Sequence, residues 1–335
     1  MKLSDINSDI LPRSPVLKYY LYRAVGGPGF IAPVYILYVL ANGVSFAELG
    51  VIGAIQSGIV LVGEIPTGYV GDRIGRRNSL LIGQLLYAVS ALGLIVGDEF
   101  IFLALAFATL SFGQTFVSGS GDAWLYDILK ELMSEDDFTQ VRGRGGAIGK
   151  WVTAVTMILG ALLYAVKPVY PFVALLVMRL VTFCVALSMP QNVQYTDDPD
   201  DDHPDDDDLT IIEAIPIIRK RLTTPPVGAF VIYMALFLGV TMTVGVYVQP
   251  ITRGALETYA AGLFSYLGVG EAASLGLLYA AFTATSAIAS DHASTLEEAL
   301  GTRETLIAIP FAAVGKIAAS TSQGLKDATW QNILS

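Results

Sequence analysis

The chain has 335 residues, of which 53% are hydrophobic and only 15% charged, with a net charge of −10. Its mean hydropathy is +0.58. This composition is too apolar and too thinly charged for an ordinary soluble domain, so we expect a membrane protein without a nucleic-acid partner.

Eight stretches of the sequence contain the roughly 20 mostly apolar residues that a membrane-spanning helix needs. They are residues 18–40, 48–70, 79–96, 100–123, 147–166, 170–189, 227–248 and 271–290. A ninth stretch begins at Thr305, but Lys316 interrupts it at about half the required length. The pattern predicts an all-α integral membrane protein with eight to nine spans.

The loops that carry Lys and Arg alternate along the chain, and this alternation sets the expected orientation. Basic residues gather before the first expected span and after the second, fourth, sixth and eighth, whereas the opposite loops hold only Lys167 and Arg253. Residues 1–15 are polar and do not form a cleavable signal peptide. We expect a multi-pass protein of the cell membrane with a cytoplasmic N-terminus.

The first expected span combines several tyrosines with the segment Gly26-Gly27-Pro28-Gly29. Glycine and proline weaken a helix in mid-membrane, where neighbouring groups must supply the lost hydrogen bonds. Phe30 and Tyr35, beside this pliable segment, are candidates for lining a substrate cavity for flat, apolar or cationic solutes. Lipid-facing tyrosines with packing glycines are the alternative interpretation.

A short turn rich in glycine and arginine joins the second and third expected spans. Glycine lets two helices approach, and Asp and Arg side chains can pair across a joint that opens and closes. The defining residues are Gly68, Asp72, Arg73, Gly75, Arg76 and Arg77. Their spacing resembles motif A, the loop signature between the second and third helices of the major facilitator superfamily (MFS) of secondary transporters. The preceding Glu64-Ile65-Pro66-Thr67 resembles its drug-efflux-like members.

The resemblance implies a helical bundle of two six-helix halves that transports a small solute by alternating access. It also implies an acidic partner for the arginines of the motif at the inner end of the fourth helix, and Asp127 is the candidate. Asp72 and Arg76 can also pair with each other if the helix continues into the turn. The proline-containing antiporter signature is absent from residues 147–166, so that motif gives no support for exchange against protons.

Ionisable residues inside expected spans are costly and therefore suggest function. Arg23, Glu64 and Asp122 all fall in the cytoplasmic third of their spans, at ~1.5 Å per helical residue, and could form one buried cluster. In that cluster Arg23 would keep one carboxylate ionised, and the other could carry a proton. Proton coupling is one hypothesis, and a structural ion-pair latch is the alternative.

Arg179 lies near the middle of the sixth expected span, where its side chain hardly reaches the membrane surface. It must therefore face the bundle interior and meet a counter-charge, a carbonyl group or an anionic ligand. We expect Arg179 to line the central cavity.

An acidic run at residues 197–208 supplies much of the negative charge and has no apolar face. Such a run predicts a solvated linker, and its composition is one that a salt-rich, halophilic cytoplasm favours. The expected domains are a complete six-helix half at residues 1–190, a cytoplasmic linker at 191–225, a partial second half at 226–315 and an atypical polar tail at 316–335. Because the family usually has twelve spans, we expect a C-terminally truncated chain.

The predicted function is secondary active transport of a small solute, as proton-coupled efflux of an apolar or cationic compound by a monomer in the lipid bilayer. A truncated fragment without transport activity is the alternative. An intramembrane aspartyl protease is a remote alternative, because the sequences around Asp122 and Asp127 resemble its two motifs. No nucleotide-binding loop and no metal-ligand spacing occur, so no enzyme, cofactor or metal site is expected.

Overall fold

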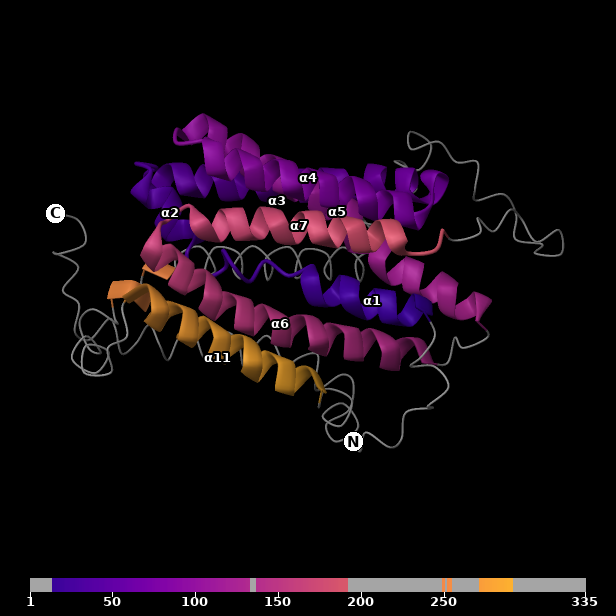
Figure 1. The fold of residues 1–335 in the computed structure, drawn as a ribbon. Helices are drawn as coiled ribbons and strands as arrows, with labels where there is room; N and C mark the ends of the chain where they lie inside the picture. Colours follow the sequence, from indigo (N-terminus) through magenta and orange to yellow (C-terminus); the bar gives the residue numbers. More distant parts are fainter. Residues whose placement is uncertain (1–13, 133–136, 192–248, 251, 255–270, 292–335) are drawn as a thin grey trace, which may run out of the picture. The chain divides into compact units, whose positions relative to one another are not determined.

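The computed structural model describes residues 14–132, 137–191, 249–250, 252–254 and 271–291, and these ranges contain helices without any β-strand (Figure 1). The helices are α1 (Ser14–Val25), α2 (Tyr35–Ala41), α3 (Phe46–Ile74), α4 (Arg76–Val96), α5 (Phe100–Glu131), α6 (Phe138–Val166), α7 (Tyr170–Ser188) and α11 (Glu271–Asp291). Residues up to Ala287 belong to one compact unit. The acidic run, the expected span at 227–248 and the tail lie outside the described residues.

Five of the described helices, α3 to α7, are long and apolar enough to cross a membrane. Their outer surfaces carry large apolar side chains, and Leu61 and Val166 leave 79% and 75% of their surface uncovered. Such surfaces are unfavourable in water but match a hydrocarbon environment, where a helix also satisfies all of its own backbone groups. The predicted all-α, multi-pass membrane fold is therefore confirmed.

The first expected span is not one continuous helix. It consists of α1 and the seven-residue α2, and turns replace helix between Val25 and Tyr35. The physical reason is the segment Gly26–Gly29, since glycine gains nothing from helical restriction and Pro28 lacks the N–H group that a helix interior requires. The sequence predicted a weakened helix here, whereas the structure interrupts it.

Helices α3 to α6 are longer than the hydrophobic segments from which they were predicted. Helix α3 continues to Ile74, so that Gly75 alone separates it from α4, and α5 extends to Glu131. Helix α6 begins at Phe138, nine residues before the expected span at 147–166. Hydropathy identifies only the part of a helix that meets lipid. At a rise of ~1.5 Å per residue, α5 is longer than the ~30 Å hydrocarbon core, so its end extends beyond the lipid.

Helix α7 contacts α4 on one side and α1 and α6 on the other (Figure 1). At one end, Lys18 of α1 donates to the carbonyl of Ser188 in α7 at 2.5 Å, and Trp124 of α5 donates to the carbonyl of Pro190 at 3.1 Å. The start of α1 and the ends of α5 and α7 thus meet. This is the arrangement that alternating spans require.

The buried apolar side chains form two main clusters, near opposite ends of these helices. One includes Tyr38, Leu94 and Phe172, and the other includes Tyr19, Trp124 and Ala186. Between the two clusters the backbones of α4 and α5 meet at Gly83 and Gly113, where a methyl group on either glycine would lie about 3 Å from the carbonyl oxygen of the other. The helix segments between the clusters frame the space described below.

Candidate functional site

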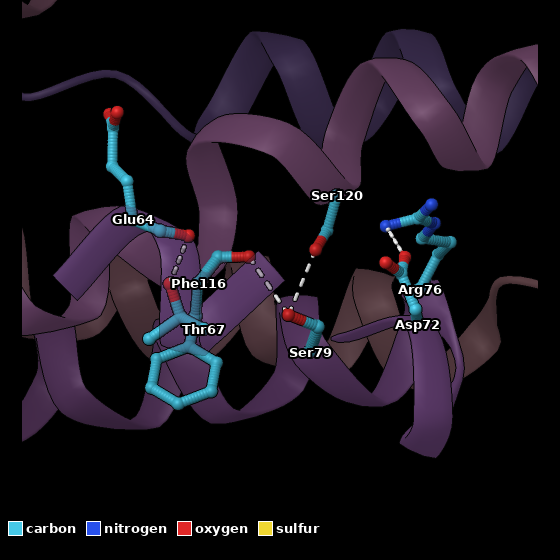
Figure 2. Close-up of polar contacts among 7 residues, drawn as sticks. All are labelled: Glu64, Thr67, Asp72, Arg76, Ser79, Phe116 and Ser120. Atoms are coloured by element: carbon cyan, nitrogen blue, oxygen red, sulfur yellow. Dashed lines mark hydrogen bonds and ion pairs between the residues drawn. The ribbon is translucent and has the colours of Figure 1, made fainter. Parts of the chain in front are cut away.

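The joint between α3 and α4 consists of Gly75, whose φ of 90° lies in the left-handed region that favours glycine. Asp72 and Arg76 form an ion pair across it, although the helix does not continue through the turn (Figure 2). The guanidinium group of Arg73 lies 4.6 Å from the centre of the Tyr69 ring, at one helical turn's spacing. Asp72, Arg73 and Arg76 thus make local contacts at the joint itself.

A buried series of hydroxyl groups connects α3, α4 and α5 just inside this joint. Ser120 donates to Ser79 at 2.8 Å, and Ser79 donates to the carbonyl of Phe116 at 3.0 Å (Figure 2). Thr67 donates to the carbonyl of Thr115 at 3.0 Å. A methyl group at Gly71 would lie 3.1 Å from the Ser79 hydroxyl oxygen. The absence of a side chain at Gly71 therefore lets the three helices converge.

Arg77, the last residue of the motif, contacts a different helix. Its Nε donates to the carbonyl of Ala186 at 3.3 Å, and its Nη2 donates to the carbonyl of Leu187, both in the last turn of α7. The final carbonyl groups of a helix lack internal partners and carry partial negative charge, so a cation stabilises them. Arg77 therefore ties the α3–α4 joint to the end of α7.

The interruption between α1 and α2 exposes backbone carbonyl groups that a continuous helix would satisfy. Arg179 of α7 donates from Nη1 to the carbonyl of Gly26 at 2.6 Å, and Thr182 donates to the carbonyl of Val25 at 3.0 Å. Arg179 is only 6% exposed. A buried cation in α7 thus completes the end of α1.

A residue from beyond the acidic run completes the other side of the interruption. The side-chain oxygen of Gln249 accepts from the backbone N–H of Ile36 at 3.1 Å, and its amide nitrogen donates to the carbonyl of Ala32. Gln249 is buried. An amide side chain can accept from an N–H group and donate to a carbonyl group at the same time, so one residue satisfies both backbone groups near the start of α2.

Helix α6 accommodates the interruption through glycines. A methyl group at Gly149 would lie 2.8 Å from the carbonyl oxygen of Arg23, and one at Gly160 would overlap the carbonyl of Phe30. Both glycines lie within residues 147–166, the segment that lacks the antiporter signature. In this structure they allow the irregular backbone of residues 26–34 to pack directly on α6.

A cavity of about 390 Å³ lies where α1, α4, α5, α6 and α7 converge beside the interruption. Its wall includes Tyr22, Gln84, Tyr87, Gln114 and Arg179. The volume is in the range of small-molecule sites. In the direction along the helices, it lies between the two apolar clusters and therefore at middle depth in the bundle.

Several polar groups in this wall contact other side chains. Gln84 donates to the hydroxyl of Tyr22 at 2.8 Å, while the side-chain oxygen of Gln84 is buried and has no hydrogen-bond partner among the described residues. The guanidinium group of Arg179 lies 4.6 Å from the centre of the Tyr87 ring, within cation–π range. The wall therefore offers fixed dipoles and a positioned cation.

The three residues expected to form a proton-coupling cluster are not brought together. Asp122 is paired with Arg142 of α6, at 2.8 Å from both Nε and Nη2, and not with Arg23. Arg23 lines the cavity, as do Gly146 and Lys150. Glu64 is exposed on α3, and its carboxylate points away from the hydroxyl series (Figure 2).

Other predicted residues have the following positions. Arg179 lines the cavity, whereas Phe30 and Tyr35 are not part of its wall. Tyr35 packs on Phe107, with 6.1 Å between ring centres. Asp127 is half-buried on α5, and because Arg76 and Arg77 have the partners described above, its pairing with them stays a prediction.

Sequence reasoning missed Gln84, Gln114, Lys150 and Arg142. Gln84 and Gln114 are amides in the middle of apolar spans, where each polar group needs a partner, and that signal could have identified them. Arg142 lay before the expected start of its span and was counted only as a loop cation. Its contact with Asp122 depends on the extension of α6 to Phe138.

Comparison with known proteins gives two matches. The model of the Major Facilitator Superfamily matches residues 24–334. YxaM, an uncharacterised MFS-type transporter of Bacillus subtilis (strain 168), is 25% identical over 220 residues, which are 63% of this chain and 53% of that protein. The match thus spans about half the length of this relative. With an all-α membrane fold, a motif A joint and a family match along most of its length, the chain belongs to the Major Facilitator Superfamily.

Proposed function

We propose that this protein is a secondary active transporter that moves a small organic solute across the cell membrane by alternating access. The observation that carries the proposal is the cavity at middle depth, framed by five helices and placed beside an interrupted span. We further propose that it works as a monomer, with its N-terminus and the α3–α4 joint at the cytoplasmic face, as the distribution of basic residues indicates.

The proposed motion uses the α3–α4 joint. Small residues at the contacts of α3 with α4 and α5, such as Gly71, Ser79 and Ser120, allow helices to shift without a large change in side-chain packing. Arg77 would hold α7 in one state and release it in another, since its bonds to the last turn of α7 are few and lie near the surface. The Asp72–Arg76 pair is local and would move with the joint.

For proton coupling, we propose Glu64 as the residue that carries the proton. Asp122 already has an ion-pair partner in Arg142. Glu64 has no ion pair among the described residues and lies on a face of α3 with the apolar Leu61 and Ile65.

The test uses purified protein in sealed vesicles with an imposed pH gradient. Radiolabelled benzenesulfonate and benzyltrimethylammonium, which are matched in size and permanently charged, serve as first probes, followed by neutral solutes. We expect solute flux above that of empty vesicles, and we expect Glu64→Gln to remove its dependence on the pH gradient while Asp122→Asn weakens it less. Unchanged pH dependence in both variants would contradict proton coupling by these residues.

The same measurement addresses the alternatives. Folded, inserted protein that gives no flux with any probe would favour a non-transporting membrane protein. An aspartyl protease needs two aspartates on neighbouring helices, but Asp122 and Asp127 both belong to α5, and Asp122 is bound by Arg142. We therefore propose no enzymatic activity.

A further inference from the structure

We infer that the cavity accepts an organic anion, an inference that rests on the proposed transport function and revises the solute class expected from the sequence. Three cationic residues from three helices belong to its wall: Arg23 of α1, Lys150 of α6 and Arg179 of α7. No Asp or Glu belongs to the wall among the described residues. A cavity lined by charges of one sign concentrates ions of the opposite sign.

Arg179 is the strongest of these three attractors because it is deeply buried. Its neighbours are the Gly26 carbonyl, which accepts from Nη1, and the Tyr87 ring. Both are dipolar groups that orient the guanidinium group, but neither carries a neutralising charge. A buried charge without a counter-ion is costly, and a bound carboxylate or sulfonate would remove that cost with paired N–H donors in the fork geometry of Arg.

The acidic residues predicted inside the described spans, Asp122 and Glu64, do not substitute for that anion. Asp122 is engaged by Arg142, and Glu64 does not belong to the cavity wall. In sequence, the expected span at 227–248 contains no charged residue, and the only acid in 271–290 is Glu271 at its first position. Among the described residues no acid neutralises Arg179, so a bound solute or small ion would supply the counter-charge at middle depth.

The rest of the wall describes the body of the solute. Tyr22, Tyr87, Leu110 and Val117 offer aromatic and aliphatic surface, and the space of about 390 Å³ admits a molecule of modest size. The unpartnered oxygen of Gln84 can accept a hydrogen bond from a hydroxyl group. These features fit a compact amphipathic acid better than a cation, which three positive charges would repel.

The experiment measures the electrostatic potential of the cavity without requiring transport. Gln114→Cys, in a Cys184→Ser background, places one thiol in the wall. It is reacted in detergent with a matched pair of methanethiosulfonates, the anionic sulfonatoethyl and the cationic trimethylammonioethyl reagents. The ratio of their rates is divided by the same ratio for 2-mercaptoethanol, so that only the effect of the site remains.

We expect the anionic reagent to be favoured by about tenfold or more. Arg23→Gln, Lys150→Gln and Arg179→Gln should each lower that preference several-fold, whereas Arg179→Lys, which keeps the charge, and Lys167→Gln, in the loop between α6 and α7, should preserve it. Because Arg179 also supports α1, the Arg23 and Lys150 variants provide the result if Arg179→Gln does not fold.

A normalised ratio at or below one, or a ratio unaffected by loss of all three cations, would overturn the inference. Failure of both reagents to reach Cys at position 114 in folded protein would overturn it too, since no soluble ion could then enter. If the anionic preference is found but vesicles give no flux, the anion site stands and the proposed transport function fails.

Discussion

The α3–α4 joint and the break between α1 and α2 are both interruptions of helical structure, and they differ in how their backbone groups are satisfied. At the α3–α4 joint a single residue, Gly75, makes the break, and the nearby charges act on the ends of helices near the surface. Between α1 and α2 the break lies in the middle of a span, and buried side chains of α7 and the buried Gln249 satisfy it.

The depth of an interruption in the membrane decides whether side chains must supply partners for its free backbone groups. Near the surface, water can replace a lost contact, so an exchange of partners at the joint in the proposed conformational change would cost little. At middle depth the surrounding hydrocarbon offers no hydrogen bonds. Each backbone carbonyl group without a partner there costs several kcal/mol. The joint is therefore suited to motion, and the interruption to holding a fixed, polar wall.

The largest effect is expected for Arg179→Leu. This change removes the donor to the Gly26 carbonyl and the cation above Tyr87, and should destabilise the protein by about 3 kcal/mol. Thermal unfolding in detergent measures the loss. If this variant were as stable as the wild type, the end of α1 would not need the hydrogen bond from α7.

Gly160→Ala should come next. The added methyl group would overlap the carbonyl of Phe30, so α6 and residues 26–34 must separate, at a cost of about 2 kcal/mol. The matched control is Gly143→Ala, on the same helix, where a methyl group meets nothing within 4 Å. Equal melting temperatures for the two variants would refute the close backbone contact.

At the surface joint, Gly75→Ala should cost about 1 kcal/mol, because alanine is strained at a φ of 90°. Gly68→Ala is the control, since Gly68 is helical and has no neighbour within 4 Å of an added methyl group. We expect Gly68→Ala to be neutral or stabilising in the same unfolding assay. A greater loss for Gly68→Ala than for Gly75→Ala would contradict the assignment of the joint to Gly75.

The smallest pair of effects separates Arg77 from Arg76. Arg77→Gln loses charged hydrogen bonds to the end of α7 and should cost about 1 kcal/mol, whereas Arg76→Gln loses a partly exposed ion pair worth at most about 0.5 kcal/mol. Both variants carry the same change of charge. The reverse order of stabilities would show that the tie to α7 is unimportant.

The sequence was sufficient to predict the membrane fold, the α3–α4 joint and the weak point at Gly26–Gly29, because hydropathy, glycine and proline act locally. It was not sufficient to identify the partners across helices. Arg142 reaches Asp122 only because α6 begins outside its apolar segment, and Arg179 finds the Gly26 carbonyl only because α1 ends there. Such pairings depend on helix ends and rotations that hydropathy does not fix.

The central claim, that the cavity opens in turn to the two sides of the membrane, is tested most directly by labelling Gln114→Cys in a Cys184→Ser background with a membrane-impermeant maleimide. Sealed vesicles that hold the protein in either orientation are labelled separately. Labelling at exposed sites outside the cavity identifies the orientation of the protein. We predict that the thiol is labelled from both sides. Labelling from one side only, at every imposed pH gradient, would contradict alternating access.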